Sequence, residues 1–217
     1  MSGQVETVLP APPLEAEQRV ILKGISWETY ERLLSEHEES SGTHFIYDQG
    51  MLEIMILSLK HEKLKHVLAL LVELLAAELG IDIEGAGSTT FRREDLARGF
   101  EPDASFYLEN VEYIRQKDEI DLTNDPPPDL VIEVDLSSLS LDKFPIFAAV
   151  GVGEIWRYAG ERVAIFVLAD GNYVERAESR ALPTVTGEAL THFVETSQTL
   201  KRTVWLRQVR EWVRTYK

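Results

Sequence analysis

Three acidic residues, Asp129, Glu133 and Asp135, alternate with apolar residues in the segment 129–135. In a β-strand these three carboxylates lie on one face, because successive side chains point to opposite faces. Carboxylates on one face repel each other unless water, a cation or a base neutralises them, and hard cations such as Mg²⁺ prefer carboxylate oxygen. The pattern therefore indicates either a metal site or the solvated face of an edge strand.

A Pro-Asp pair, Pro102-Asp103, opens a second apolar segment 30 residues before Glu133. A Pro-Asp pair followed, after a gap, by an acid inside an apolar strand resembles the PD-(D/E)xK nuclease superfamily. Three phrases more closely resemble the signature of the restriction endonuclease-like family common in cyanobacteria: EPDASFY at 101–107, PPPDLVIEVD at 126–135 and GVGEIWRY at 151–158. The resemblance covers residues 25–173 of the chain.

The resemblance implies an α/β fold with a restriction-endonuclease-like core, in which helices flank a mixed β-sheet. It also implies a metal-dependent endonuclease that hydrolyses the phosphodiester bonds of DNA. On this interpretation Asp103 and Glu133 bind Mg²⁺ or Mn²⁺ with help from the carbonyl oxygen of Val134. The metal would polarise a phosphate oxygen and lower the pKa of a bound water.

One residue departs from the pattern of the superfamily. Its lysine normally follows the second acid by two residues, and Asp135 occupies that position here. The resemblance suggests that the lysine has moved to the following helix, where Lys143 is the candidate. Lys143 would orient or activate the attacking water and stabilise charge on the transition state, while Asp135 would be a further ligand or face solvent.

The clearest helix is predicted over 60–79, where apolar residues recur at helical spacing before Gly80. In the superfamily an acid on the first core helix can help to hold the metal. Glu62 and Glu73 are therefore candidates, although an exposed position is the favoured interpretation for both. His61 could bind a transition metal, but a surface position in the first turn is favoured for it too.

Composition limits the possible function. The 217 residues carry a formal net charge of −15 and include no cysteine. The absence of cysteine fits a cytoplasmic protein, and neither a secretory signal nor an apolar stretch long enough to cross a membrane is found. So acidic a chain does not attract nucleic acid by its overall charge. The charge and the missing strand lysine favour an alternative from another class, a homodimeric binding or structural protein that keeps the nuclease fold without the activity.

The chain is predicted to have three parts. Residues 1–17 hold three prolines and few large apolar residues, which predicts a flexible tail. Residues 18–200 form the restriction-endonuclease-like domain. Residues 201–217 carry a net charge of +5 and a helical apolar stripe that includes Trp205 and Trp212. This basic amphipathic helix is expected to dock on the body or on a dimer partner, with contact to the DNA backbone as the alternative.

Hydrophobic periodicity and turn residues predict the other elements. Helices are expected from Ser26 to Glu38 and from Asp142 to Val150. Strands are expected over 43–47, 51–57, 81–84, 88–92, 100–108, 154–158, 162–168 and 173–176.

Overall fold

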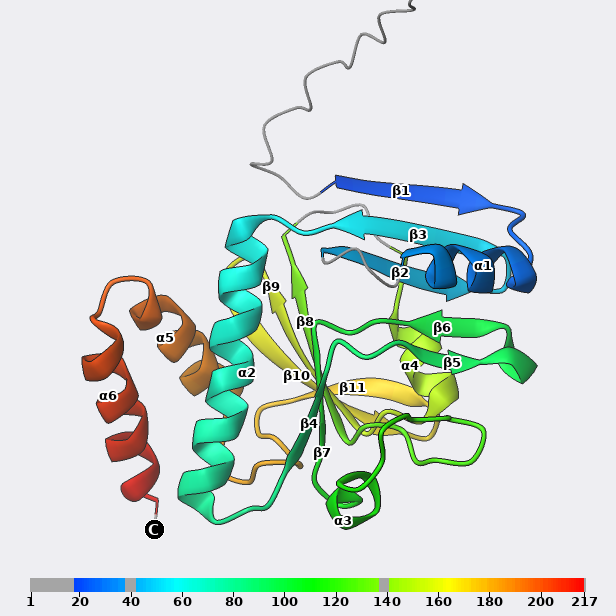
Figure 1. Cartoon of the computed structure of the whole chain (residues 1–217). Helices are drawn as coiled ribbons and strands as arrows, with labels where there is room; N and C mark the ends of the chain where they lie inside the picture. The colour runs from blue at the N-terminus through cyan, green and yellow to red at the C-terminus, as the bar shows by residue number, and fades with distance from the viewer. Residues whose placement is uncertain (1–17, 38–41, 137–140, 217) are drawn as a thin grey trace, which may run out of the picture.

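The computed structural model describes residues 18–37, 42–136 and 141–216 (Figure 1). The tail predicted over 1–17 lies outside the described residues. The described chain forms two β-sheets, and helices α2, α5 and α6 lie together beside the second sheet. None of the helices in the described ranges is long and apolar enough to cross a membrane.

Five antiparallel strands form the first sheet, in the order β1-β3-β2-β6-β5. Their bounds are β1 Gln18–Lys23, β2 Thr43–Asp48, β3 Met51–Ile56, β5 Phe91–Arg93 and β6 Arg98–Phe100. The β2–β3 hairpin turns at Gln49 and Gly50, whose φ angles are 46° and 94°. A two-residue hairpin turn of this type needs positive φ at both positions, and the strands predicted over 43–47 and 51–57 are confirmed.

Six strands form the second sheet, in the order β11-β10-β9-β8-β7-β4. Their bounds are β4 Glu84–Gly87, β7 Ala104–Tyr107, β8 Leu130–Asp135, β9 Glu154–Ala159, β10 Arg162–Ala169 and β11 Asn172–Arg176. Strands β8 and β9 are parallel and the other neighbours are antiparallel, so the sheet is mixed. A parallel pair needs a crossover connection, which contains α4 (Phe144–Val150). The predicted α/β class with a restriction-endonuclease-like core is confirmed.

The remaining helices lie around the two sheets. They are α1 Trp27–His37, α2 Leu59–Leu79, α3 Val111–Ile114, α5 Gly187–Ser197, α6 Arg202–Arg214 and the 3₁₀ helix η1 Glu94–Leu96. Helix α2 has both of its ends capped: the Ser58 hydroxyl accepts the backbone N–H of His61 at 3.2 Å, and Gly80 ends the helix at φ 74°. These are the preferred residues for an N-cap and a left-handed C-cap. Ser58 therefore fixes the first turn of α2, and Gly80 fixes its end.

Strand β8 is an interior strand, since β7 and β9 pair with its two sides. One face carries Leu130, Ile132 and Val134, which pack in the core with α2, α5 and α6. Val131 on the other face packs with Ile46 of the first sheet. The predicted division of side chains between two faces is confirmed, and the edge-strand interpretation is wrong because both faces of β8 are covered.

The single strand predicted over 100–108 is wrong. The chain leaves the first sheet after β6, changes direction at Glu101-Pro102-Asp103, and enters the second sheet at β7. Pro102 has no N–H to donate to a ladder, so a break is natural at this position. The strand limits predicted on either side of Gly85-Ala86-Gly87 are also wrong, because β4 includes these residues.

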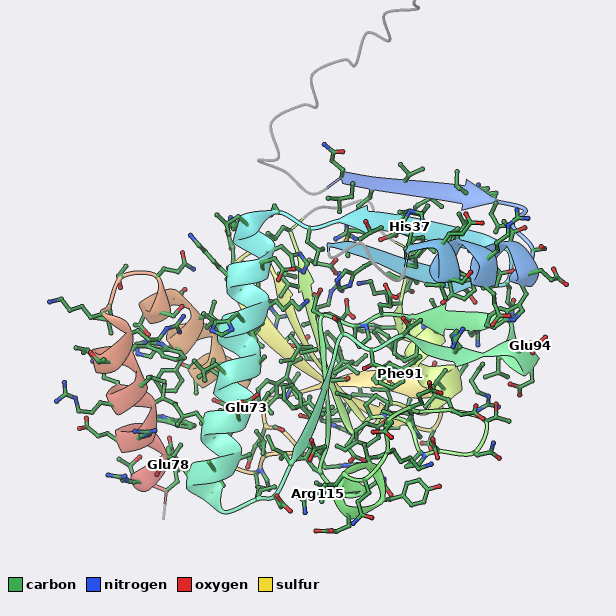
Figure 2. The ribbon with its side chains drawn as sticks, in the orientation of Figure 1. His37, Glu73, Glu78, Phe91, Glu94 and Arg115 are labelled. Atoms are coloured by element: carbon green, nitrogen blue, oxygen red, sulfur yellow. The ribbon has the colours of Figure 1, made fainter. Side chains whose placement is uncertain are left out.

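Helix α6 docks on α2 and α5 of its own chain (Figure 2). Trp205 is fully buried, and its Nε1 donates to the carbonyl of Phe193 at 2.8 Å. Trp212 is half-buried. Arg210 and Arg214 each lie 3.5 Å from Glu78, near the C-terminal end of α2. Part of the basic charge of this helix is therefore used to hold it against the body.

Candidate active site at the junction of the two sheets

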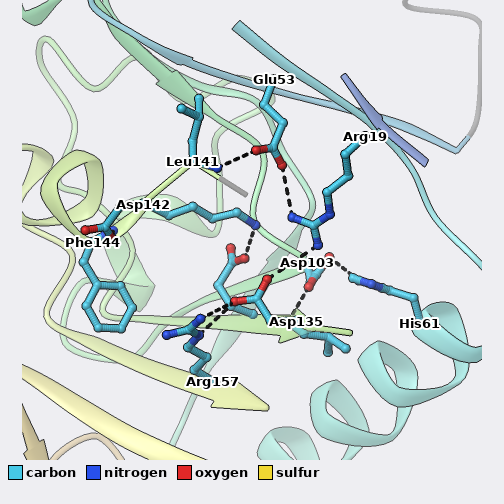
Figure 3. A network of polar contacts seen from close by, with 12 residues as sticks. Arg19, Glu53, His61, Asp103, Asp135, Leu141, Asp142, Phe144 and Arg157 are labelled. Atoms are coloured by element: carbon cyan, nitrogen blue, oxygen red, sulfur yellow. Dashed lines mark hydrogen bonds and ion pairs between the residues drawn. The ribbon is translucent and has the colours of Figure 1, made fainter. Parts of the chain in front are cut away.

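Asp103 lies at the junction of the two sheets, next to Glu133. The β7–β8 ladder ends at the pair Ala104 and Ile132, so the next residue on each strand is Asp103 or Glu133. Asp103 is 1% exposed, and its Oδ2 accepts the backbone N–H of Val134 at 2.7 Å. Its Oδ1 lies 2.8 Å from Nε2 of His61 (Figure 3). The backbone of one strand and the first turn of α2 therefore position this carboxylate.

The surface position favoured for His61 is wrong, because the side chain is fully buried against Asp103. A signal for this was present in the sequence: His61 continues the stripe of Leu64, Leu68 and Leu71 at helical spacing, and these residues are buried too. Helix positions three and four residues apart share a face.

The two acids considered on α2 do not reach the site. Glu62 is exposed and lies 3.7 Å from Lys65, and Glu73 is also exposed (Figure 2). The favoured surface interpretation is confirmed for these residues.

Lys143 contacts Glu133. Lys143 stands immediately before α4 and is 7% exposed, and its Nζ donates to Oε2 of Glu133, which is 2% exposed. The connection from β8 to α4 therefore folds back and brings an ammonium group to the acid of the strand. The other carboxylate oxygen of Glu133, Oε1, is buried and has no hydrogen-bond partner among the residues that the structure describes.

The pKa values of these groups are coupled through their charges. Burial raises the pKa of Glu133 to about 7, and the Asp103 charge adds to this, while Lys143 opposes it. Burial opposes the charge of Lys143, but Glu133 and Asp103 outweigh it and its pKa is raised. Burial likewise acts against ionised Asp103, but the hydrogen bond and charge of His61 prevail, so the pKa of Asp103 is lowered. Glu133 is therefore the group that titrates near neutrality.

Asp135, in the position of the superfamily's lysine, is ion-paired. Its Oδ2 accepts from Nε and Nη2 of Arg157 at 2.8 and 2.7 Å, and its Oδ1 lies 3.5 Å from Arg19 of β1. Arg19 also donates to Glu53 of β3 at 3.1 Å, and Glu53 accepts the backbone N–H of Leu141 at 2.6 Å (Figure 3). This network ties the first sheet to the second beside Glu133.

Sequence reasoning missed three polar residues near the site. Glu53 is fully buried, and an acid at the centre of the apolar segment 51–56 was a usable signal. His44 of β2 is buried, and its Nδ1 lacks a hydrogen-bond partner within the described ranges. Burial lowers the pKa of His44, and the Asp103 charge partly offsets this. No feature of the sequence distinguishes Arg19.

The donor atoms suit a metal ion that also takes ligands from water or substrate. No group of three or more His, Cys, Asp or Glu side chains among the described residues is arranged to hold a metal. Mg²⁺ needs no such cage: it is usually bound by one or two carboxylates together with waters and substrate phosphates. The carboxylates of Asp103 and Glu133 fit that mode, and Oε1 of Glu133 has no partner within the described part of the chain. Val134 provides its N–H to Asp103, and its carbonyl as a ligand stays a prediction.

Comparison with known families identifies the family of the chain. Residues 27–198 match the model of the Uma2 family, whose description is "Putative restriction endonuclease". No protein with a curated description matches the chain. The match includes Asp103 just before β7, Glu133 of β8, Lys143 and the whole of the second sheet. It covers more than half of the sequence, so the chain belongs to the Uma2 family, within the restriction endonuclease-like PD-(D/E)xK superfamily.

Proposed function

We propose that this protein is a metal-dependent DNA endonuclease that hydrolyses phosphodiester bonds, with Asp103, Glu133 and Lys143 at its reacting centre. The observation that carries the proposal is the buried contact between Lys143 and Glu133, next to Asp103. Two carboxylates and one ammonium group are the set expected of a PD-(D/E)xK nuclease, although the ammonium group comes from a different position of the chain. Family membership supports a nuclease-like function.

Asp103 and Glu133 would hold Mg²⁺ or Mn²⁺. When bound, the metal would supply Lewis-acid stabilisation of the phosphate and acidify the attacking water. The carboxylate of Asp103 is held in place by Val134 and His61, so little reorganisation is needed before it acts as a ligand. Asp135 is a poorer ligand candidate, because Arg157 and Arg19 already neutralise it.

Lys143 takes the part of the strand lysine. Hydrolysis forms a bond from the water oxygen to phosphorus and breaks the bond to one sugar oxygen, which leaves with a proton. Negative charge grows on the phosphate oxygens as this happens, and a fixed ammonium group in a site of low dielectric stabilises it. The raised pKa of Lys143 keeps it charged at neutral pH.

A second candidate function is favoured by specific observations. Asp103 and Glu133 are nearly inaccessible, an ion-paired acid replaces the strand lysine, and the net charge is −15. These features also suit a homodimeric binding or structural protein that has kept the nuclease fold.

Exposed Val20, Leu22 and Ile56 on β1 and β3 support a homodimer in either case, since exposed apolar patches often mark contacts. The cysteine-free composition supports a cytoplasmic location.

Nicking of supercoiled plasmid separates the two candidates. The endonuclease proposal expects conversion to the open-circular form with Mg²⁺ or Mn²⁺ and none with EDTA. A homogeneous preparation that leaves the plasmid intact with both metals would instead support the binding protein.

The raised pKa of Glu133 predicts a pH-dependent metal affinity. Below about pH 7 Glu133 carries a proton that the metal must displace. The apparent Mn²⁺ affinity should therefore rise roughly tenfold from pH 6 to pH 8, with about one proton released on binding at the lower pH. Calorimetric titration in buffers of different ionisation enthalpy measures both quantities. Glu133→Gln should abolish the binding, whereas equal affinity in that variant would exclude Glu133 as a ligand.

A further inference from the structure

A groove of about 710 Å³ runs between the N-terminal half of α2 and the start of α6. Its cationic lining comes from Lys60 and Lys63 on α2 and from Arg202 on α6, and Leu59 and Val67 add apolar surface. In Figure 1 the N-terminal end of α2 and the connection between α5 and α6 lie at the same end of the molecule. Segments far apart in sequence thus form one groove with three cations in its lining.

The cations of this groove are available to a ligand. Lys60, Lys63 and Arg202 are exposed, and none forms an ion pair with another residue in the described part of the chain. The groove includes one acid, Glu62, which lies 3.7 Å from Lys65. By contrast, other arginines of α6 are paired with Glu78. The guanidinium of Arg202 lies 5.1 Å from the centroid of the Trp205 ring, without an acidic partner among the described residues. In a protein of net charge −15, a groove whose three cations form no ion pair within the described ranges is a local exception.

The groove adjoins the candidate active site through the first turn of α2. His61 lies between Lys60 and Glu62 in sequence and contacts Asp103 on the inner side of the helix. Lys60 and Lys63 line the groove on another side of the same turn. A helix with its side chains is about 10–12 Å across, and duplex DNA carries about one phosphate charge per 1.7 Å of its axis. The two places lie on different sides of one helix, a separation that corresponds to about six or seven phosphate charges along a duplex.

We propose that this groove binds the sugar–phosphate backbone of duplex DNA beside the scissile bond. The inference rests on the proposed function and names the surface that holds its substrate. Charge complementarity is the argument: lysine binds phosphate as a point charge and arginine through its fork of donors. Contacts of this kind set position and affinity but read no sequence. This local patch also allows an acidic protein to bind DNA against its overall charge.

The test is the salt dependence of binding to a fluorescently labelled duplex, followed by anisotropy. Ca²⁺ replaces Mg²⁺ so that a hard cation is present, and a gel confirms that the duplex stays intact. The triple variant Lys60→Gln/Lys63→Gln/Arg202→Gln should bind on the order of 100-fold more weakly at 0.1 M salt. The slope of log affinity against log salt should become shallower by about 2 to 3, because each phosphate contact contributes roughly 0.9.

A matched control removes three exposed cations elsewhere, in the variant Lys23→Gln/Arg32→Gln/Arg207→Gln. Its slope should stay close to that of the wild type. Two results would overturn the inference: an unchanged slope in the groove variant, or an equal change of slope in both variants. The nuclease proposal would still stand in either case if the plasmid is nicked. A wild-type protein that neither binds the duplex nor nicks plasmid would overturn both. Melting temperatures of both variants exclude unfolding as the cause.

Discussion

Replacing Lys143 by methionine should slow DNA cleavage by roughly 100- to 1000-fold at saturating Mn²⁺, the range measured when one preorganised electrostatic group is removed. Methionine keeps the length and apolar character of the side chain but removes the ammonium group that donates to Glu133. Asp103 and Glu133 remain, so Mn²⁺ should still bind. Single-turnover cleavage of an end-labelled duplex, alongside calorimetric titration of Mn²⁺, separates turnover from metal binding.

A stability control separates chemistry from folding. Removing one partner of a buried ion pair destabilises by about 3–5 kcal/mol unless the other partner is neutralised. The double variant Lys143→Met/Glu133→Gln removes both groups and should be more stable than Lys143→Met at pH 8, where the single variant must either bury an unpaired carboxylate or take up a proton on Glu133. If well-folded Lys143→Met cuts at the wild-type rate, Lys143 has a structural role and the part of the strand lysine is filled by another residue.

Replacing Trp205 by alanine should lower the free energy of unfolding by about 3–5 kcal/mol, as for other buried tryptophans. Trp205 is fully buried between α6 and the body, and its indole N–H is bonded to the carbonyl of Phe193. The variant loses this packing and the hydrogen bond from the indole N–H. For a chain of this size the melting temperature should fall by about 10 °C.

Tyr216 near the end of the described chain provides the matched control. It is 56% exposed, so Tyr216→Ala should change the free energy of unfolding by no more than about 0.5 kcal/mol. Urea denaturation followed by circular dichroism measures both variants. A Trp205→Ala protein as stable as the wild type would mean that α6 contributes little to the fold in solution.

Much of the second sheet and the central helix was predictable, because local signals there agree with the tertiary structure. Leu130, Ile132 and Val134 alternate with the acids, and β8 places them on opposite faces. Gly80 ends α2 where the apolar stripe ends. The acids of the candidate site were predicted from their unusual place inside apolar segments and from the family resemblance, and Lys143 was predicted from the absence of a lysine at position 135.

Other features depend on long-range contacts that local patterns do not encode. The break at Pro102 separates strands of different sheets, although the residues around it read as one strand. Strand β1 was missed because it is an edge strand whose outer residues are exposed, and α5 was also missed. Arg19 reaches Asp135 across 116 residues of sequence. The burial of His61 was not predicted, because histidine in the first turn of a helix is more often exposed. Its place in the helical stripe indicates burial instead.

Single-turnover cleavage of labelled duplex by Asp103→Asn tests whether Asp103 takes part in cutting DNA. Asparagine keeps the shape of the side chain and an oxygen for the Val134 N–H but loses the charge needed to hold a metal ion. Glu73→Gln, which changes an exposed acid of α2 in the same way, is the control. The proposal predicts that wild type and Glu73→Gln cut the duplex at similar rates in Mg²⁺ and that Asp103→Asn is slower by at least about 100-fold. A folded Asp103→Asn protein that cuts at the wild-type rate would contradict it.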